Sequence, residues 1–176
     1  MKNLVTFSTN QPLEPSAQFK VGVRSVPYLA DHGFQDMVVL PGSFYVEMAL
    51  YADRVLFKRV PGLVRNVIFY TPIILSAEDT VIGVEIRDRG DGCVEYTFYE
   101  AGGVEDGSAR PAVRLPAARL EIDQDRLASV GAGSDAFSIA AFQAKSHAVI
   151  DSGQFYATLR DNGNQLAQAT FTVQQT

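Results

Sequence analysis

The sequence centres on Asp31-His32-Gly33-Phe34-Gln35-Asp36-Met37-Val38-Val39-Leu40-Pro41-Gly42-Ser43. This stretch places a histidine in a predicted loop, continues through four apolar residues, turns at Pro-Gly and opens an amphipathic helix that carries Glu47. A helix with a largely apolar surface has little structural use for a carboxylate at that position. A histidine and a glutamate brought to one apolar site would form a ready acid–base pair.

The helical pattern runs from Ser43 to about Arg59. Its apolar side chains recur on one face at Phe44, Met48, Tyr51 and Val55. The Ser43 hydroxyl is placed to cap the start, and Pro61-Gly62 stops the helix. A long, largely apolar helix in a chain otherwise rich in strands must lie against a sheet, because no other element would cover it.

The rest of the chain has the alternation of short strands. We expect an arm or edge strand within residues 1–16 and strands over 18–26, 63–75 with a bend at Pro72, 80–87, 93–99 and 109–122. A tight Gly90-Asp91-Gly92 turn should join two of these strands as an antiparallel hairpin. One strand, then a helix, then four or more antiparallel strands predicts an α+β fold in which a curved antiparallel sheet wraps round one central helix.

The composition changes after residue 122, and this change divides the chain into two predicted parts. Residues 1–122 form the main domain, and residues 123–176 form a linker and C-terminal segment. Within that segment we expect a polar, glycine-bearing linker at 123–135, short helices at 137–146 and 153–160, and a last strand over 165–174.

Composition excludes several classes of function. A net charge of −5 argues against nucleic acid or an anionic membrane as the main partner, although an acidic carrier protein can still dock on a local basic patch. Cys93 is the only cysteine, which fits a reducing compartment, and the sequence has neither a signal-peptide pattern nor an apolar run of membrane-spanning length. We therefore expect a cytoplasmic protein. Two distant histidines and one cysteine are too few for a metal site, and no phosphate-binding or dinucleotide-binding glycine loop is present.

The spacing His32-x8-Pro41-Gly42 resembles the active-site segment of hot-dog-fold dehydratases, which act on 3-hydroxyacyl chains held on an acyl carrier protein. It is most similar to the N-terminal hot-dog of polyketide synthase dehydratase domains. The matching segments are Leu29-Ala30-Asp31-His32, Val38-Val39-Leu40-Pro41-Gly42 and Tyr45-Val46-Glu47-Met48-Ala49-Leu50. Bacterial fatty-acid dehydratases are similar but have one residue fewer between the histidine and the proline.

The likeness covers residues 17–122 and, more loosely, 153–171. Two departures from the family pattern stand out. The glycine that the family has four residues after the histidine is Asp36 here. The Tyr-Gly-Pro expected after Gly163-Asn164-Gln165 is replaced by Leu166-Ala167-Gln168.

The resemblance implies roles for particular residues. His32 would be the general base that removes the Cα proton of the thioester, because an unperturbed histidine changes charge near physiological pH. Glu47 is either an acid held protonated by apolar surroundings or an ordinary helix carboxylate with its own ion pair. Gly42 is either an oxyanion donor at the helix start or a simple Pro-Gly turn. The remaining residues expected to line the substrate are Val39, Leu40 and Pro41.

The resemblance also implies a cofactor-free reaction in which the phosphopantetheine of a carrier protein holds the substrate. In this family the acid usually comes from a second, C-terminal hot-dog, which a chain of 176 residues is too short to contain. We therefore expect a homodimer, or pairing with a separate half, to complete a double hot-dog.

Two alternatives remain open. A hot-dog acyl thioesterase uses a carboxylate and water on similar thioesters, although the His-x8-Pro-Gly spacing speaks against it. The other alternative is a non-catalytic half-domain that binds acyl chains or carrier protein, or that awaits a partner half.

Overall fold

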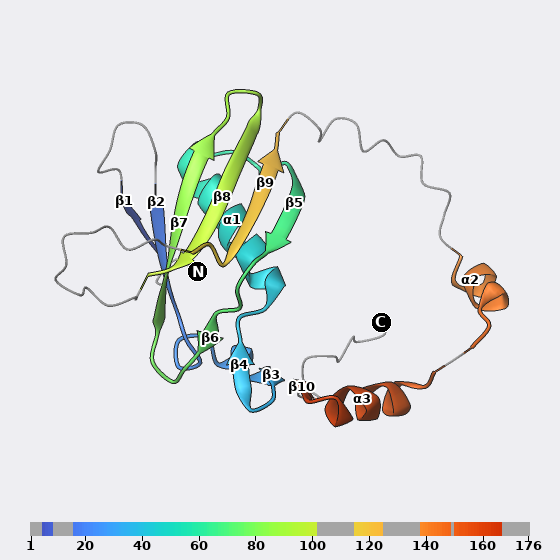
Figure 1. The fold of residues 1–176 in the computed structure, drawn as a ribbon. Helices are drawn as coiled ribbons and strands as arrows, with labels where there is room; N and C mark the ends of the chain where they lie inside the picture. Colours follow the sequence, from blue (N-terminus) through green and yellow to red (C-terminus); the bar gives the residue numbers. More distant parts are fainter. Residues whose placement is uncertain (1–4, 9–15, 102–114, 125–137, 149, 167–176) are drawn as a thin grey trace.

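The computed structural model describes residues 5–8, 16–101, 115–124, 138–148 and 150–166 (Figure 1). Its strands and helices, in chain order, are β1 (Val5–Ser8), β2 (Ser16–Val21), the 3₁₀ helix η1 (Pro27–Asp31), β3 (His32–Phe34), β4 (Met37–Val39), α1 (Gly42–Phe57), β5 (Leu63–Phe69), β6 (Ile74–Leu75), β7 (Thr80–Asp88), β8 (Cys93–Glu100), β9 (Ala118–Asp123), α2 (Ile139–Lys145), α3 (Ser152–Asp161) and β10 (Asn164–Leu166).

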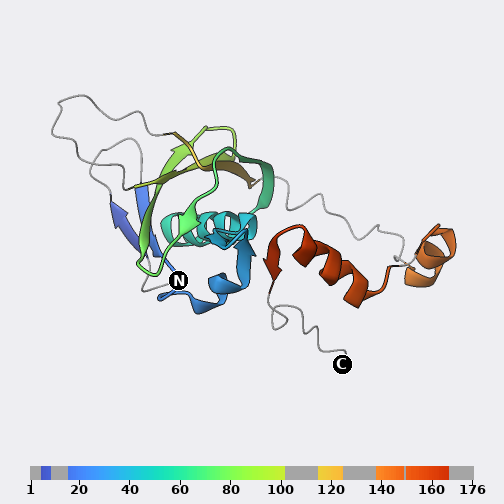
Figure 2. The same cartoon turned by 60° about the horizontal axis from the view of Figure 1, so that its bottom comes forward.

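A six-stranded sheet forms the body of the molecule, in the order β1-β2-β7-β8-β9-β5. Every neighbouring pair in it is antiparallel. The sheet curves round α1, which lies along its concave face (Figures 1 and 2). A smaller sheet in the order β10-β3-β4-β6 lies at the end where α1 begins. The predicted α+β arrangement of an antiparallel sheet wrapped round one helix is therefore confirmed.

The core is the contact between α1 and the inner face of the sheet. The buried residues of α1 recur every three or four positions and so lie on one face of the helix: Phe44, Tyr45, Met48, Ala49, Ala52 and Asp53. On β7, β8 and β9 every second residue belongs to the apolar core: Ile82, Val84, Ile86, Val94, Tyr96, Phe98, Ala118, Leu120 and Ile122. On β9 the carboxyl residues Glu121 and Asp123 are buried as well. Burial of each large apolar side chain contributes about 1.5–3 kcal/mol to stability.

Three details of the predicted helix were wrong. Val55 is 40% exposed, because the buried stripe runs instead toward Asp53. Ser43 does not cap the helix: it lies in the first turn, and Pro41 occupies the N-cap without a side-chain cap bond. The helix ends at Phe57, before the predicted stop, because Lys58 adopts a left-handed conformation with φ of 52°.

One predicted strand is shorter in the structure, and another is described only in part. The strand predicted over 18–26 ends at Val21, because the Gly22 amide donates to Ser25 Oγ at 3.1 Å and starts a turn. The strand predicted over 165–174 begins at Asn164, and its part beyond Leu166 lies outside the described residues. The linker at 125–135 also lies outside them, so the boundary at residue 122 stays a prediction. No helix in the described ranges combines the length and apolarity needed to cross a membrane.

One carboxyl group lies inside the contact between helix and sheet. Asp53 of α1 is fully buried and accepts a hydrogen bond of 2.8 Å from the hydroxyl of Tyr96 on β8. The Arg59 guanidinium lies 3.3 Å from the same carboxyl oxygen. Burial, and then the hydrogen bond to Asp53, raises the pKa of Tyr96, so this phenol stays neutral and donates. A buried carboxylate is tolerated only with such partners, and these join the second half of α1 to β8.

We predict that Tyr96→Phe lowers the free energy of unfolding by about 1–3 kcal/mol, because it removes a donor from a buried carboxylate and keeps the ring. Tyr99→Phe is the matched control, since its hydroxyl donates to Glu85 at an exposed position, and it should cost less than about 0.5 kcal/mol. Urea unfolding followed by circular dichroism measures both. Equal losses in the two variants would contradict a structural role for the Asp53–Tyr96 bond.

A second polar network holds the edge strand β5 to β9. Glu121 accepts hydrogen bonds from Asn66 at 2.7 Å, Arg65 at 3.1 Å and Arg89 at 3.1 Å. The pairing of β5 with β9 shifts register between Arg65 and Ile68, and Asn66 in that bulge has φ of 52°. Burial by itself would raise the pKa of Glu121, but the bonds from Asn66 and Arg65 outweigh burial and lower it. The ionised form therefore stabilises the bulge.

We predict that Glu121→Gln makes stability less sensitive to acid. Because the pKa of Glu121 is lower in the folded chain than in the unfolded chain, its contribution is present above the unfolded pKa and is lost as pH falls through the folded one. The difference in unfolding free energy between wild type and Glu121→Gln should thus shrink from about pH 6 to about pH 3. The exposed Glu78 supplies the control Glu78→Gln. A difference in unfolding free energy between wild type and Glu121→Gln that stays constant with pH would refute the prediction.

Candidate active site

His32 does not lie in a loop, as predicted from the sequence, but begins β3. This strand pairs with β4 in a hairpin whose register is Gly33↔Val38 and Phe34↔Met37. The two residues at the tip, Gln35 and Asp36, have φ values of 47° and 62°. Positive φ at both central residues is typical of a type I′ hairpin turn. The apolar run after the histidine thus supplies a partner strand for the histidine's own segment.

A backbone carbonyl orients the His32 imidazole. Its Nδ1 atom lies 3.0 Å from the carbonyl oxygen of Val39. Because a carbonyl oxygen only accepts, Nδ1 carries the proton and donates it, which leaves Nε2 as the basic nitrogen. The side chain is exposed, so Nε2 is accessible from outside the chain. Sequence reasoning assigned Val39 to the substrate and missed this contact, which the hairpin register would have indicated.

Two residues connect the hairpin to the start of α1. Leu40 is buried, and its amide donates to the Ile73 carbonyl at 2.9 Å. Pro41 is extended, with ψ of 145°, and Gly42 is the first helical residue. A Cβ atom on Gly42 would lie 2.7 Å from Cζ of Phe69, so the glycine allows that ring of β5 to approach the helix start. The structure therefore places Val39 against His32, and Leu40 and Pro41 lead from Val39 to Gly42 at the start of the helix.

Tyr45 supports this end of the helix from inside. Its ring contacts Phe69 at a centroid distance of 5.8 Å and Phe98 at 5.3 Å. Burial raises the pKa of Tyr45 to about 12, so its phenol stays neutral at working pH. Tyr45 therefore packs the Phe69 ring against the core rather than supplying a charge.

Glu47 lies two residues after Tyr45 on α1 and is exposed. The described part of the chain therefore leaves its carboxyl group in contact with solvent. The apolar surroundings that would keep the group protonated have to come from beyond those residues or from a partner.

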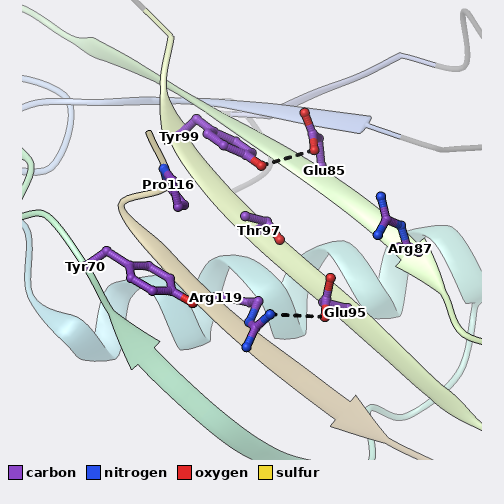
Figure 3. A pocket seen from close by; sticks show the side chains of 8 residues that line it. All are labelled: Tyr70, Glu85, Arg87, Glu95, Thr97, Tyr99, Pro116 and Arg119. Atoms are coloured by element: carbon purple, nitrogen blue, oxygen red, sulfur yellow. Dashed lines mark hydrogen bonds and ion pairs between the residues drawn. The ribbon is translucent and has the colours of Figure 1, made fainter. Parts of the chain in front are cut away.

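Two hollows are found among the described residues. An open cleft of about 530 Å³ lies beside the contact between the hairpin tip and the C-terminal segment, with Asp31, Asp36 and Arg160 in its lining. Another, of about 240 Å³, lies on the sheet face turned away from α1 (Figure 3). Within it, Arg119 pairs with Glu95 at 3.8 Å and the Tyr99 hydroxyl donates to Glu85 at 3.2 Å. Within the described ranges, no three His, Cys, Asp or Glu residues are grouped to hold a metal ion.

Comparison with known proteins gives a family match. The model of the family described as polyketide synthase dehydratase domain matches residues 4–101, more than half of the chain. Highly reducing polyketide synthase SAT13 of Stachybotrys chartarum is 34% identical over 74 residues, which cover 39% of this chain. A mycocerosic acid synthase-like polyketide synthase of Mycobacterium tuberculosis is 36% identical over 89 residues, 49% of this chain. The matches span only 3% and 4% of those two proteins.

Solved structures with the same fold are also dehydratase domains. That of a mycocerosic acid synthase-like polyketide synthase aligns with a TM-score of 0.72 at 23% identity, covering 94% of this chain and 54% of that one. The dehydratase domain from the CurF module of curacin polyketide synthase aligns at 0.71 and 15% identity, covering 93% of this chain and 56% of that one. The predicted hot-dog fold is confirmed, and the chain spans about half of each solved domain.

Proposed function

This chain belongs to the polyketide synthase dehydratase family, and from that premise we propose that it contributes the base-bearing half of a site that dehydrates a 3-hydroxyacyl thioester. The substrate is carried on an acyl carrier protein, and the products are the trans-2-enoyl thioester and water, in polyketide or fatty-acid-like biosynthesis. The single observation that carries this proposal is the bond from His32 Nδ1 to the Val39 carbonyl, which leaves Nε2 basic and exposed.

In the proposed reaction, Nε2 of His32 takes the Cα proton of the thioester. The electrons of that C–H bond form the C2=C3 double bond as the C3–O bond breaks, and the hydroxyl leaves as water after accepting a proton from an acid. The Gly42 amide at the start of α1 would donate to the thioester carbonyl as negative charge develops on its oxygen. The backbone of Val39, Leu40 and Pro41 would lie along the acyl chain. No resident cofactor is needed for these steps.

The acid would come from a second hot-dog. Within one chain Glu47 is exposed, on a part of α1 that the sheet does not cover. β5 is an edge of the six-stranded sheet, and its exposed apolar residues include Val67, Ile68 and Phe69. An apolar strand edge of this kind favours pairing with another strand. We propose a two-fold homodimer in which Glu47 of one chain faces His32 of the other, completing a double hot-dog.

A second candidate is a half-domain that works only with a different partner half. The observation in its favour is that the chain spans 54–56% of the solved dehydratase domains compared above. In that arrangement the acid belongs to the partner, and Glu47 is an ordinary helix carboxylate. The proposed setting is the cytoplasm in both cases, since the single cysteine fits a reducing compartment.

We predict that His32→Ala lowers dehydration of a 3-hydroxyacyl thioester by about 10²- to 10⁴-fold, the usual contribution of a general base. Folding should persist, because the imidazole is exposed and contributes little packing. His147→Ala is the control, since His147 is exposed in the segment after α2. Product formation is followed by mass spectrometry, and release of free thiol is followed in parallel. Wild-type turnover by folded His32→Ala would refute the base, and His32-independent thiol release would favour a thioesterase.

Mixing two inactive variants tests the source of the acid. In the homodimer, His32→Ala and Glu47→Gln chains should regain part of the lost activity, because each mixed dimer keeps one intact site. About half of the dimers are mixed when equal amounts exchange freely, so about a quarter of wild-type activity is expected. If the mixture stays inactive although mass spectrometry shows that subunits exchange, Glu47 is not the acid and the separate partner half gains support.

A further inference from the structure

We propose that Gln165 is a positioning residue for His32: it clamps Asp36 at the tip of the β3–β4 hairpin and thereby holds the hairpin that orients the imidazole. The inference rests on the proposed function, in which His32 is the general base. The clamp itself, however, acts on the geometry of the imidazole, which is measurable without turnover.

The tip of the hairpin needs outside support. Gln35 and Asp36 both have positive φ, at 47° and 62°. Glycine and asparagine adopt this conformation readily and aspartate less readily, whereas glutamine rarely adopts it. Residues held in such conformations persist when the surrounding structure fixes them. The two strands of this hairpin are only three residues each, so their own pairing fixes it weakly.

The support comes from the C-terminal strand β10. It pairs with β3 in the register Gln165↔Gly33, with one pair on either side. The Gln35 amide donates to the Gly163 carbonyl at 2.9 Å. The Gln165 side chain donates from Nε2 to Asp36 Oδ1 at 2.6 Å. One short segment therefore gives the first tip residue a backbone bond and the second a side-chain bond to its carboxylate, a charge-assisted bond that is stronger than a neutral one.

Gly33 makes room for this clamp. A Cβ atom on Gly33 would lie 2.6 Å from Oε1 and 2.9 Å from Cβ of Gln165. Without that atom, the Gln165 side chain can lie across β3 and reach Asp36. Gly33, Asp36 and Gln165 therefore act as one unit, although 129 residues separate Asp36 from Gln165 in the sequence.

The hairpin transmits the clamp to the imidazole. Beyond the pair Gly33↔Val38, the next opposed positions are His32 and Val39. The bond of 3.0 Å from His32 Nδ1 to the Val39 carbonyl therefore spans the two strands at the open end of the hairpin. A change of twist at the tip alters the distance between these strands, and with it the bond that keeps the proton on Nδ1. Loss of the clamp should therefore release the imidazole into both tautomers.

The test is ¹⁵N NMR of the histidine rings in the full chain, at a pH where they are neutral. The sequence has only two histidines, so His147→Gln assigns the spectrum. Wild type should show mainly the Nδ1–H tautomer of His32. In Gln165→Ala the ratio of Nδ1–H to Nε2–H should fall by about fivefold, the effect of losing the neutral hydrogen bond from Nδ1 to the Val39 carbonyl. Gln154→Ala, at an exposed glutamine of α3, is the matched control and should leave the ratio unchanged.

A rescue separates positioning from general damage. Asp36→Gly places at the tip a residue that adopts φ of 62° without a clamp, so this variant should keep the Nδ1–H tautomer. Adding Gln165→Ala to it should then have no further effect, a non-additivity that a simple loss of stability would not produce. An unchanged tautomer ratio in Gln165→Ala would overturn the clamp. So would an equal fall of the ratio when Gln165→Ala is made in the wild type and in Asp36→Gly.

Turnover then distinguishes failure of the clamp from failure of the proposed function. In the paired enzyme, Gln165→Ala should lower kcat about tenfold with little change in KM, because the base is misoriented while substrate contacts remain. If Gln165→Ala loses the preference for the Nδ1–H tautomer but keeps the wild-type kcat, Gln165 does not position His32 for catalysis. If His32→Ala itself dehydrates normally, the proposed function fails, while the tautomer result still decides whether the clamp exists.

Discussion

The packing of α1 against the concave face of the sheet is the interaction on which the rest of the structure depends. Small residues, Ala49 and Ala52, bring the helix close to the strands, and large side chains fill the space around them. Asp53 and Tyr96 join its second half to β8 through a buried hydrogen bond. With the helix axis fixed in this way, its first residue is fixed as well, and the histidine hairpin is attached to that end by two residues.

The same packing leaves one side of the molecule incomplete. The sheet covers the buried stripe of α1 but not Glu47, and β5 ends the sheet with an apolar edge. The site segment lies next to this edge, where the Phe69 ring of β5 covers Gly42. A partner that pairs with β5 would therefore also reach the site. The proposed chemistry, with base and acid from different hot-dogs, therefore depends on what pairs with the β5 edge of the sheet.

The sequence predicted what depends on local pattern and spacing. It predicted the alternating strands β7 and β8, the central helix α1 and the His32-x8-Pro41-Gly42 segment. The type I′ turn was not predicted, because Gln35-Asp36 carries none of the glycine or asparagine that usually marks such a turn. Burial of Asp53 was missed because its partner, Tyr96, lies 43 residues away, and the Gln165–Asp36 contact was missed because its partners lie 129 residues apart. The roles of His32, Gly42 and Glu47 stay predictions.

Sedimentation equilibrium of the purified full chain, over a range of concentrations, tests most directly the claim that this fold is half of a site. The exposed edge of β5 predicts a mass of two chains, or of one chain plus a partner half when that half is supplied. The mass should fall to that of one chain when a charge is placed on the edge by Val67→Lys, with the helical signal unchanged. A monomer at every concentration, with and without a candidate partner half, would contradict the claim.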